Sequence, residues 1–271
     1  MITLFGATGY TGRRVARALD RAELPFRIAG RTPEKLAALQ AELAARPALV
    51  VADAHRPEPL FAGQPPGPHV LLNCVGPFPA LGGPVAQAAA LRGSRYLDVS
   101  NELAFVHGLR QYDALARSAG AALVPAAGFE VAIADCLAAR AARELGGALD
   151  ALHVIYALPG EAVSYGTRLS GLRTYATGWW TYRGGRWVGR LPGGEVRAGT
   201  LGGRPYRAIS FPSAEVVTVP AHVALKEVQA WLAVAPRWAR LVAALMPLTD
   251  VLLRTPLGAL TAFSFRRLAP P

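Results

Sequence analysis

The stretch Ile2–Gly12, ITLFGATGYTG, decides the fold of the chain. The apolar run Ile2–Phe5 predicts a short buried strand, and RRVARAL after Gly12 predicts a helix. In the turn between them, Gly6 allows a tight bend, Gly9 lets backbone amides approach a pyrophosphate, and Gly12 lets the helix pack closely on the strand. A strand, a glycine-rich turn and a helix in this order predict dinucleotide binding at the helix N-terminus. The predicted contacts come from Gly6, Thr8, Gly9, Tyr10, Thr11 and Gly12.

The second predicted strand leads into Gly30 and Arg31. Arg31 stands 19 residues beyond Gly12, where a site specific for NAD carries an acidic residue that binds the ribose hydroxyls. A guanidinium at this position favours the 2′-phosphate of NADP, and Gly30, Thr32 and Lys35 are expected to complete the contact. The alternative is an arginine that only caps a surface loop.

Residues 1–128 alternate short apolar runs with alanine-rich helical stretches, which is the pattern of a parallel sheet with crossover helices. They predict an α/β fold, a Rossmann doubly wound parallel sheet. The loop Arg56–His69 contains five prolines, so the third crossover is expected to be short and irregular. The predicted strands are 2–5, 26–29, 49–52, 70–75, 96–99 and 122–124, and the predicted helices are 12–20, 33–45, 84–92 and 103–118.

Two further strand ends carry candidate cofactor contacts. Asp53, after the third strand, is expected either to reach the adenine ring or to form a turn. The fourth strand ends in NCVGPF at the carboxyl edge, near the point where an open α/β sheet binds its ligands. Val75, Gly76 and Pro77 are expected to border the nicotinamide, and Phe78 to cover its ring. A simple loop turn explains the same residues.

After residue 128 the pattern changes and predicts a second α+β domain, residues 129–271, for substrate binding or dimerisation. A helix over 130–145 and an extended run over 149–158 come first. Residues 186–219 are broken by LPGG, LGG and FPS, which predict an antiparallel sheet of hairpins, and a helical C-terminal tail is expected from about His222. An aromatic cluster is expected to line either a lipid-binding pocket or a hydrophobic sheet face or dimer interface. It consists of Trp179, Trp180, Tyr182 and Trp187.

The composition excludes several classes of protein. Of 271 residues 52% are hydrophobic, enough to fill a core, which excludes intrinsic disorder. The formal net charge of +11 raises the question of an anionic partner, but the arginines are scattered, so nucleic-acid binding is not expected. Cys74 and Cys136 fit no zinc or disulfide spacing. They are predicted to be buried thiols in a reducing compartment, and no metal site is expected.

The terminal segments predict a cytoplasmic protein. The first strand follows Met1 without a secretory signal. The apolar segment 241–263 is interrupted by prolines and charged residues, so it is not expected to cross a membrane. The tail carries Trp231 and Trp238 among arginines, and it is expected either to lie on a membrane surface or to pack on its own core or a second subunit. A homodimer through the second domain is expected.

Several segments together resemble the saccharopine dehydrogenase-like oxidoreductases, including the trans-acting enoyl reductases that work on lipid chains. These are GATGYTG, the AGR after the second strand, NCVGPF, YLDVSNE at 96–102 and PAAGFEVAIAD at 125–135. YGT at 165–167 resembles a further segment of the family, whereas Asn101, Glu130 and Ala132 or Ile133 depart from its pattern and mark a divergent member. The resemblance implies NADP-dependent oxidoreduction with the cofactor on the N-terminal half.

The reduction of a carbonyl or imine needs a proton donor. The Tyr-x-x-x-Lys pair of short-chain dehydrogenases is absent, because neither Lys35 nor Lys226 has a tyrosine four residues before it. Tyr165 is the predicted acid, with a half-buried structural tyrosine as the alternative. The chain is thus expected to be an NADP-dependent enzyme that reduces a C=C, C=O or C=N bond of an apolar, lipid-like small molecule. The alternative function is a non-catalytic NADP-sensing regulator that acts through a protein partner.

Three other acidic residues stand near the expected crevice. Asp98 ends the fifth predicted strand and is expected either to cap a loop or to contact the cofactor. Glu102 and Glu130 are expected to complement helix N-termini.

Overall fold

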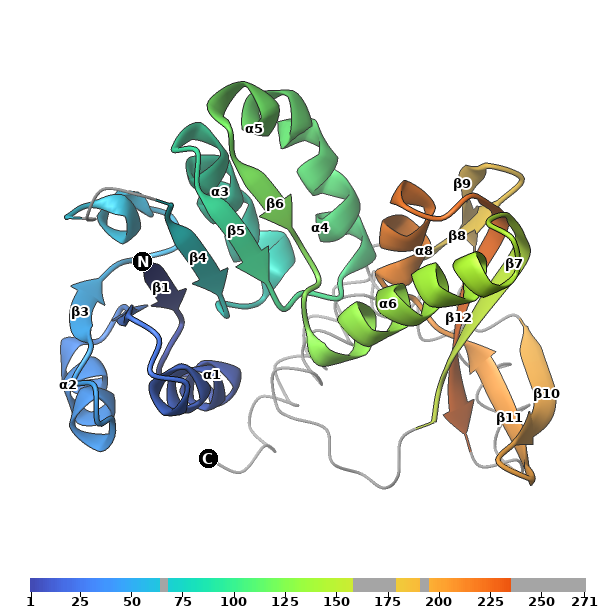
Figure 1. Ribbon diagram of the computed structural model, residues 1–271, viewed down its shortest axis with the longest axis horizontal. Coiled ribbons are helices and arrows are strands. Elements are labelled where there is room, and N and C mark those ends of the chain that lie inside the picture. Colours follow the sequence, from blue (N-terminus) through green and yellow to red (C-terminus); the bar gives the residue numbers. More distant parts are fainter. Residues whose placement is uncertain (64–67, 158–178, 191–194, 235–271) are drawn as a thin grey trace, which may run out of the picture. The chain divides into compact units, whose positions relative to one another are not determined.

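The computed structural model describes residues 1–63, 68–157, 179–190 and 195–234. The chain divides into two compact units. The first comprises Met1–Asn101 and Phe105–Phe129, and the second comprises Glu102–Ala104 and the residues from Glu130 onward. Each unit is built around a six-stranded sheet (Figure 1).

The first unit is a parallel sheet with the strand order β3-β2-β1-β4-β5-β6. This is the order of a Rossmann fold, and it confirms the predicted α/β class. Helices α1 and α2 lie on one side of the sheet, and α3 and α5 lie on the other (Figure 1). The elements are β1 (Ile2–Phe5), α1 (Tyr10–Arg21), β2 (Phe26–Gly30), α2 (Pro33–Glu42), β3 (Ala48–Val51), η1 (Glu58–Phe61), β4 (Val70–Asn73), α3 (Phe78–Leu91), β5 (Arg95–Asp98), α4 (Leu103–Gly108), η2 (Leu109–Tyr112), α5 (Asp113–Ala119) and β6 (Ala122–Val124).

The sheet buries its central strands because helices cover both of its faces. All five residues of β2, FRIAG, are buried, as expected for a parallel strand between two helical layers. Helix α1 turns Ala16 and Leu19 toward the sheet, and α2 turns Leu36 and Leu39. These side chains form one core with Leu4, Ala7, Phe26, Ile28 and Leu43.

The third crossover contains the 3₁₀ turn η1 in place of a long helix, as its prolines predict; residues 64–67 are not described. A buried arginine holds this crossover on the sheet. The Arg27 guanidinium donates from Nε to Thr3 Oγ1 at 2.8 Å, from Nη1 to the Ala62 carbonyl at 2.7 Å, and from Nη2 to the Leu60 carbonyl. Thr3 Oγ1 in turn lies 2.9 Å from His69 Nε2, so one polar network links β2, β1 and the start of β4.

Two helices differ most from their predicted bounds. Helix α3 begins at Phe78, not at Pro84, which lies inside it. Gly82, two residues before the predicted start, serves packing, since a Cβ on it would lie 2.5 Å from the Phe105 ring. The helix predicted over 103–118 is divided into α4, η2 and α5.

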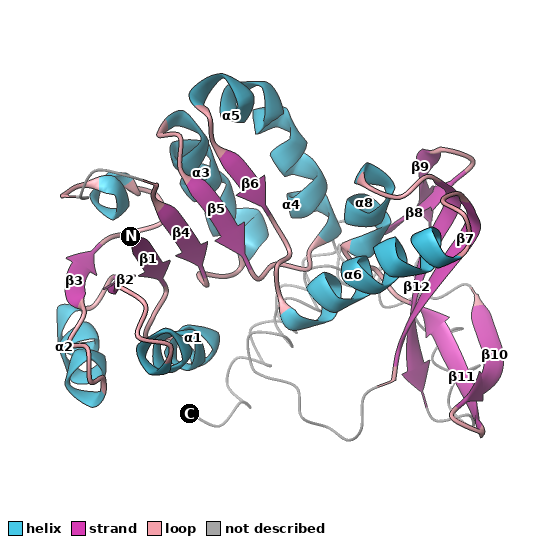
Figure 2. Ribbon diagram, viewed as in Figure 1, coloured by secondary structure: helices cyan, strands magenta, loops and turns pink. Residues whose placement is uncertain are grey.

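The second unit contains a mixed sheet with the order β10-β11-β12-β8-β9, to which β7 is joined through β12. Neighbours along the path are antiparallel, whereas β7 runs parallel to β12. The predicted second α+β fold with antiparallel hairpins is therefore confirmed (Figure 2). The elements are α6 (Phe129–Glu144), β7 (Leu149–Tyr156), β8 (Trp179–Arg183), β9 (Arg186–Arg190), β10 (Val196–Leu201), β11 (Arg204–Ser210), α8 (Glu215–Thr218), η3 (Val219–Ala221) and β12 (Leu225–Val234).

The prediction of a helical tail from about His222 is wrong over the described residues. Leu225–Val234 form strand β12, which pairs with β7 on one edge and with both β8 and β11 on the other. Trp231 is only 3% exposed, and its indole N–H donates to His153 Nδ1 at 3.2 Å, so it is not part of a membrane-facing surface. Trp238 and the segment 241–263 lie outside the described residues.

The two thiols also differ from each other. Cys74 is partly buried, whereas Cys136 on α6 is exposed, so the prediction of two buried thiols is wrong for Cys136. Its position in an apolar-looking stretch suggested burial, but that face of α6 also exposes Ile133 and Leu137. Among the described helices none has the length and apolar character needed to span a membrane.

Candidate cofactor site

The glycine-rich turn after β1 leaves no room for side chains at two of its positions. Gly6 adopts φ +82°, in the left-handed region that favours glycine, and a Cβ on it would lie 2.8 Å from Val75 Cγ2. A Cβ on Gly12 would collide with the Gly6 carbonyl group. The Gly9 amide donates to the Gly6 carbonyl at 3.0 Å. The turn therefore presents bare backbone, which is the form that a pyrophosphate can approach closely.

Helix α1 begins directly after this turn and offers open backbone donors. Its first helical bond runs from the Arg13 amide to the Gly9 carbonyl at 2.9 Å, so the amides of Tyr10, Thr11 and Gly12 have no partner within the helix. The first turn contains no acidic residue, and the N-cap Gly9 has no side chain to cap it. The positive end of the helix dipole is thus available to an anion.

Arg13 fixes the turn in place, a role that the sequence reading did not assign. Its Nε donates to the Thr8 carbonyl at 3.3 Å, and its Nη1 pairs with Glu42 Oε1 at 3.0 Å. Arg17 Nη2 pairs with the other oxygen of Glu42 at 2.9 Å. The Arg17 and Arg13 guanidiniums hold the pKa of Glu42 below its usual value. One carboxylate on α2 thereby anchors two cations of α1.

Arg31 and Lys35 are exposed beyond the end of β2, on the side of the glycine turn. Within the described part of the chain, neither side chain has a hydrogen bond or an ion pair. Gly30 is buried, and a Cβ on it would lie 3.9 Å from Thr8 Oγ1, which places the end of β2 beside the turn. Thr32 is the exposed N-cap of α2 and makes no side-chain cap. The structure thus brings together the residues predicted to hold a 2′-phosphate.

Val75 and Gly76 follow β4, the strand next to β1, at the point where the strand order reverses. The close approach of Val75 to Gly6 places the two strand ends together, and the Cys74 amide donates to the Phe5 carbonyl at 2.8 Å. Gly76 is exposed, and its peptide bond to Pro77 is cis. These residues lie at the predicted ligand-binding edge.

Phe78 lies in the core. Its side chain is 6% exposed and its ring centroid is 5.5 Å from that of Phe105, at a tilt of 36°. This packing of α3 on the helical layer argues against Phe78 covering the nicotinamide ring, and we leave it out of the cofactor site.

Asp53 forms a turn, the second of its two predicted alternatives. Its Oδ1 accepts the His55 amide at 2.9 Å, and Asp53 and Arg56 form a short antiparallel bridge. Asp98 likewise caps a loop, because its Oδ1 accepts the Ser100 amide at 2.9 Å. Tyr165, the predicted proton donor, lies outside the described residues.

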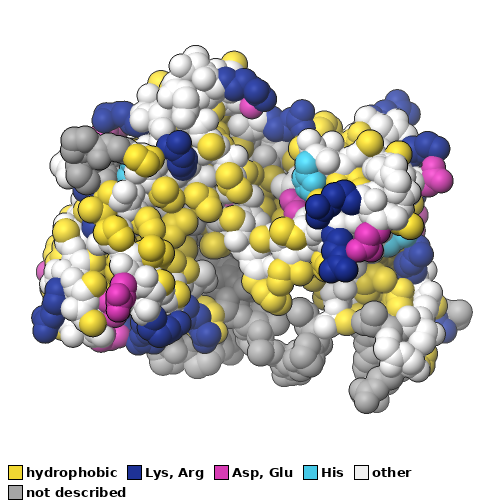
Figure 3. Space-filling model, viewed as in Figure 1, with side chains coloured by type: hydrophobic (Ala, Val, Ile, Leu, Met, Phe, Trp, Pro, Cys, Tyr) yellow, Lys and Arg dark blue, Asp and Glu magenta, His cyan; other side chains and the backbone are white. Residues whose placement is uncertain are grey.

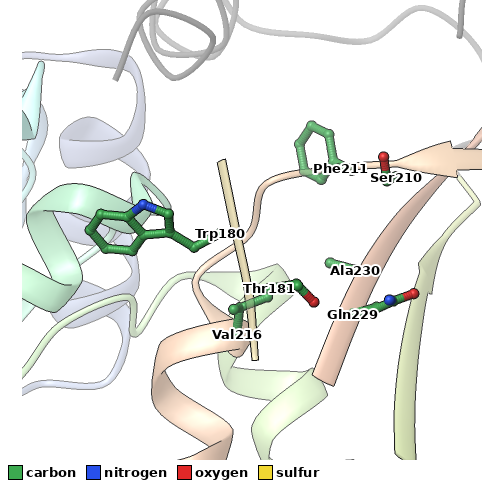
Figure 4. Close-up of a pocket in the computed structure, with 7 residues that line it drawn as sticks. All are labelled: Trp180, Thr181, Ser210, Phe211, Val216, Gln229 and Ala230. Carbon is green, nitrogen blue, oxygen red and sulfur yellow. The ribbon is translucent and has the colours of Figure 1, made fainter. Parts of the chain in front are cut away.

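The second unit contains a small cavity beside the aromatic cluster (Figure 4). Trp180 and Thr181, which project to opposite sides of β8, both line the cavity, together with the apolar side chains of Phe211 and Val216. The volume of the cavity, ≈ 20 Å³, has room for about one water molecule, not for a substrate. Tyr182 and Trp187, by contrast, pack edge to face on the sheet with centroids 5.6 Å apart, and the Trp187 indole donates to the Val216 carbonyl at 3.0 Å.

Next to this cavity, α8 carries a buried acid that the sequence reading missed. Both carboxyl oxygens of Glu215 are buried and lack a hydrogen-bond partner among the described residues. Burial raises its pKa to about 8, and the nearby Asp135 and Glu130 add to the increase. Asp135 itself accepts the Thr218 hydroxyl at 2.9 Å and lies 3.6 Å from His222 Nε2. The short EVVT segment gives no sequence signal that separates Glu215 from a surface residue.

Positive charge on the described surface is distributed in small groups. On the face drawn in Figure 3, Lys and Arg side chains form several small, separate groups, with apolar surface between the groups. This distribution suits a small anionic ligand that contacts one or two cations.

Comparison with known proteins agrees with a dinucleotide-binding fold for the first unit. Residues 2–124 match the model of the saccharopine dehydrogenase NADP binding domain. A trans-acting enoyl reductase of Mycobacterium ulcerans is 36% identical over 135 residues, which cover 48% of this chain and 32% of the relative. A probable mitochondrial saccharopine dehydrogenase-like oxidoreductase of Arabidopsis thaliana is 35% identical over 147 residues, with the same two coverages of 48% and 32%. The match therefore spans about a third of the length of these relatives.

The match to a solved structure is weaker. A myo-inositol dehydrogenase from Corynebacterium glutamicum is 16% identical with a TM-score of 0.45, over 86% of this chain and 67% of that one. The fold assignment rests on the strand order described above.

The strand order and the glycine turn define a dinucleotide-binding Rossmann domain, and the family model that it matches is that of an NADP-binding domain. More closely, residues 2–124 are similar to the NADP-binding domain of saccharopine dehydrogenases.

Proposed function

We propose that this chain is an NADPH-dependent reductase that acts on a C=C, C=O or C=N bond of an apolar, lipid-like small molecule. The observation that carries the proposal is the Arg31 guanidinium, which is exposed beyond the end of β2 and has no carboxylate partner among the described residues. It stands beside a turn that presents bare backbone to an anion. The names of the trans-acting enoyl reductase relatives favour a C=C bond among the three.

Different residues of the chain bind different parts of the cofactor. The amides of Tyr10, Thr11 and Gly12 bind the pyrophosphate, and Arg31 with Lys35 binds the 2′-phosphate. The backbone of Val75 and Gly76 borders the nicotinamide side. When bound, NADPH supplies the hydride. Tyr165 is the residue that we propose as proton donor, because reduction of a polar double bond also needs a proton.

The test is a fluorescence titration of the full chain with NADPH and with NADH, on the wild type and on Arg31→Ala. Loss of one charge-assisted contact costs about 1.5–3 kcal/mol. NADPH binding is therefore expected to weaken by about tenfold or more, and NADH binding to stay within about twofold. Arg21→Ala, at the far end of α1, is the matched control and should bind both nucleotides like the wild type. Equal weakening of both nucleotides by Arg31→Ala would contradict the proposal.

A second measurement separates an enzyme from a regulator. NADPH oxidation is followed with enoyl, carbonyl and imine substrates that carry apolar chains, using the wild type and Tyr165→Phe. Turnover that falls at least tenfold in Tyr165→Phe, with unchanged NADPH binding, supports a reductase with this donor. Binding of both oxidised and reduced cofactor without turnover favours the regulator. Light scattering of the same samples tests the homodimer that we also propose.

A further inference from the structure

The ends of β4 and β5 carry a buried polar cluster that the cofactor site described above does not use. Asn73 is 1% exposed, Tyr96 0% and Asp98 2%. Asn73 and Asp98 are direct neighbours in the register of the two strands, and Asn73 Nδ2 donates to the Tyr96 hydroxyl at 3.2 Å. Burying the Asp98 carboxyl group costs desolvation free energy, which hydrogen bonds to that group must offset.

The Asp98 carboxyl joins two loops that are remote in sequence. Its Oδ1 accepts the Ser100 amide at 2.9 Å, the Ser100 hydroxyl at 2.6 Å and the Ala126 amide at 2.9 Å. The Asp98 carbonyl also accepts the Ala127 amide at 2.7 Å. We call these four residues the Asp98 clamp. It fastens the loop after β5 to the loop after β6.

The clamp holds Ala126 in an unfavourable backbone conformation. Ala126 has φ +57°, in the left-handed region that costs a residue with a Cβ about 1–2 kcal/mol. A Cβ on the neighbouring Gly128 would lie 3.7 Å from Val99 Cα, so the two loops also pack directly on each other. Backbone strain persists where the surroundings determine the geometry, and it concentrates at ligand-binding loops.

The Asp98 clamp lies in the half of the sheet that serves one half of the dinucleotide. A Rossmann sheet binds a dinucleotide with two halves, and the half made by β1, β2 and β3 carries the glycine turn and Arg31. The half made by β4, β5 and β6 ends at Val75, at Ser100 and at the loop around Ala126. The clamp therefore shapes the carboxyl edge on the nicotinamide side.

From this geometry we propose that Asp98 is a positioning residue for the nicotinamide half of NADP. It fixes the loops after β5 and β6 so that they form one preorganised wall for that half. The inference rests on the proposed function, because it presupposes that NADP binds at the carboxyl edge. It does not require Asp98 to touch the cofactor.

The remaining oxygen of Asp98 supplies a conservative variant. Oδ2 has no hydrogen-bond partner among the described residues, whereas Oδ1 carries all three side-chain contacts. Asp98→Asn retains the Oδ1 acceptor and puts an amide NH₂ in place of Oδ2, so it changes the interaction between this side chain and the Tyr96 hydroxyl. Asp98→Ala removes the three side-chain contacts of the clamp and leaves the backbone bond from Ala127. The pair therefore separates loss of the negative charge, which both variants share, from loss of the Oδ1 acceptor and the side-chain volume, which occurs only in Asp98→Ala.

The experiment compares NADPH with 2′,5′-ADP, a fragment that lacks the nicotinamide half, by calorimetric titration of wild type, Asp98→Ala and Asp98→Asn. Asp98→Ala is expected to weaken NADPH at least tenfold and to leave 2′,5′-ADP within about twofold, because the fragment depends on the glycine turn and Arg31. Asp98→Asn is expected to restore NADPH binding to within about threefold. The fluorescence gain of bound NADPH, which reports on the nicotinamide ring, should fall in Asp98→Ala and return in Asp98→Asn.

Several results would overturn the proposal. NADPH binding by Asp98→Ala at the wild-type affinity is one, and equal weakening of NADPH and the fragment is another, since it indicates a general structural role. If Asp98→Ala does not fold, Ser100→Ala is measured instead. An NADPH affinity that falls at least threefold, with unchanged affinity for 2′,5′-ADP, supports the proposal. Wild-type affinity for both ligands overturns it. A wild type that binds neither ligand contradicts the proposed function itself, which is a different result from any of these.

Discussion

The carbonyl oxygen of Gly6 lies 2.1 Å from the point that a Cβ atom of residue 12 would occupy. No side chain fits at this distance. Because residue 12 is glycine, the start of α1 can approach the turn after β1 this closely. This contact sets the geometry of the phosphate-binding turn.

Gly12→Ala is expected to destabilise the protein by about 1–3 kcal/mol or more, because the backbone of the turn must move. It should also abolish NADPH binding. Urea unfolding and NADPH titration measure the two effects. The matched control is Gly108→Ala at the end of α4, a helical position (φ −60°) whose Cβ would meet nothing within 4 Å and which should be neutral or stabilise by up to about 1 kcal/mol. A Gly12→Ala protein with wild-type binding would refute the steric argument.

Arg27→Met is expected to lower the free energy of unfolding by about 2–4 kcal/mol. The change removes three donors and leaves the carbonyls of Leu60 and Ala62 without their contacts to the guanidinium. Relief of the buried charge, whose desolvation lowers the Arg27 pKa, offsets only part of this loss. Arg27→Lys should fall between the two proteins, and the exposed Arg21→Met should change little. The measurement is urea unfolding, and wild-type stability of Arg27→Met would contradict the role given to the network.

Stability is expected to decline with rising pH because of Glu215. Burial raises its folded-state pKa to about 8 from an ordinary value of 4.5, so the folded state holds the proton more tightly than the unfolded state. The stabilisation is complete below pH 4.5 and is lost as the pH rises through about 8. Glu215→Gln cannot ionise, so its advantage over the wild type should grow from pH 5 to pH 9 in urea unfolding.

The control for this titration is Glu144→Gln on α6. Glu144 is 62% exposed in a surface pair with Arg140, so its substitution should give a small difference that hardly changes over the same range. A constant difference between Glu215→Gln and the wild type would show that Glu215 does not titrate as its burial requires.

The two cysteines should react differently with a thiol reagent such as DTNB. Cys136 is exposed on α6 and is expected to react in the native protein, whereas burial raises the Cys74 pKa to about 12 and leaves little thiolate. One thiol should therefore react natively and two in denaturant. Cys136→Ser should remove the native reaction, and a native reaction that persists in this variant would contradict the assignment.

The first unit was predictable because local sequence patterns indicate its strands and helices. Short apolar runs that alternate with turn residues and helices are typical of a parallel sheet, and strands β1 and β6 have their predicted bounds. Strand β12 was not predictable in this way. It has neighbours on both edges, and residues 228–231 are all buried, so its sequence lacks the alternation that separates a strand from a buried helix.

The same distinction holds for the functional residues. The glycine turn and Arg31 are recognisable because each follows a strand at a characteristic spacing. Asp98 acts through Ala126, 28 residues away, and Glu215 is distinguished only by what surrounds it after folding. Their roles depend on contacts that no local pattern encodes. Phe78 shows the reverse case, in which a correctly predicted strand is followed by a side chain that turns into the core.

The central place of β12 has a consequence for synthesis on the ribosome. All six strands of the first sheet are available once residue 124 has emerged, so the cofactor-binding half can fold early. The second sheet lacks its middle until Leu225–Val234 have been made, because β7, β8 and β11 each pair with that strand. Until then β7, β8 and β11 expose unpaired edges, the kind of surface on which nascent chains associate with one another. The later half of this protein is therefore the part that most needs protection while it is being translated.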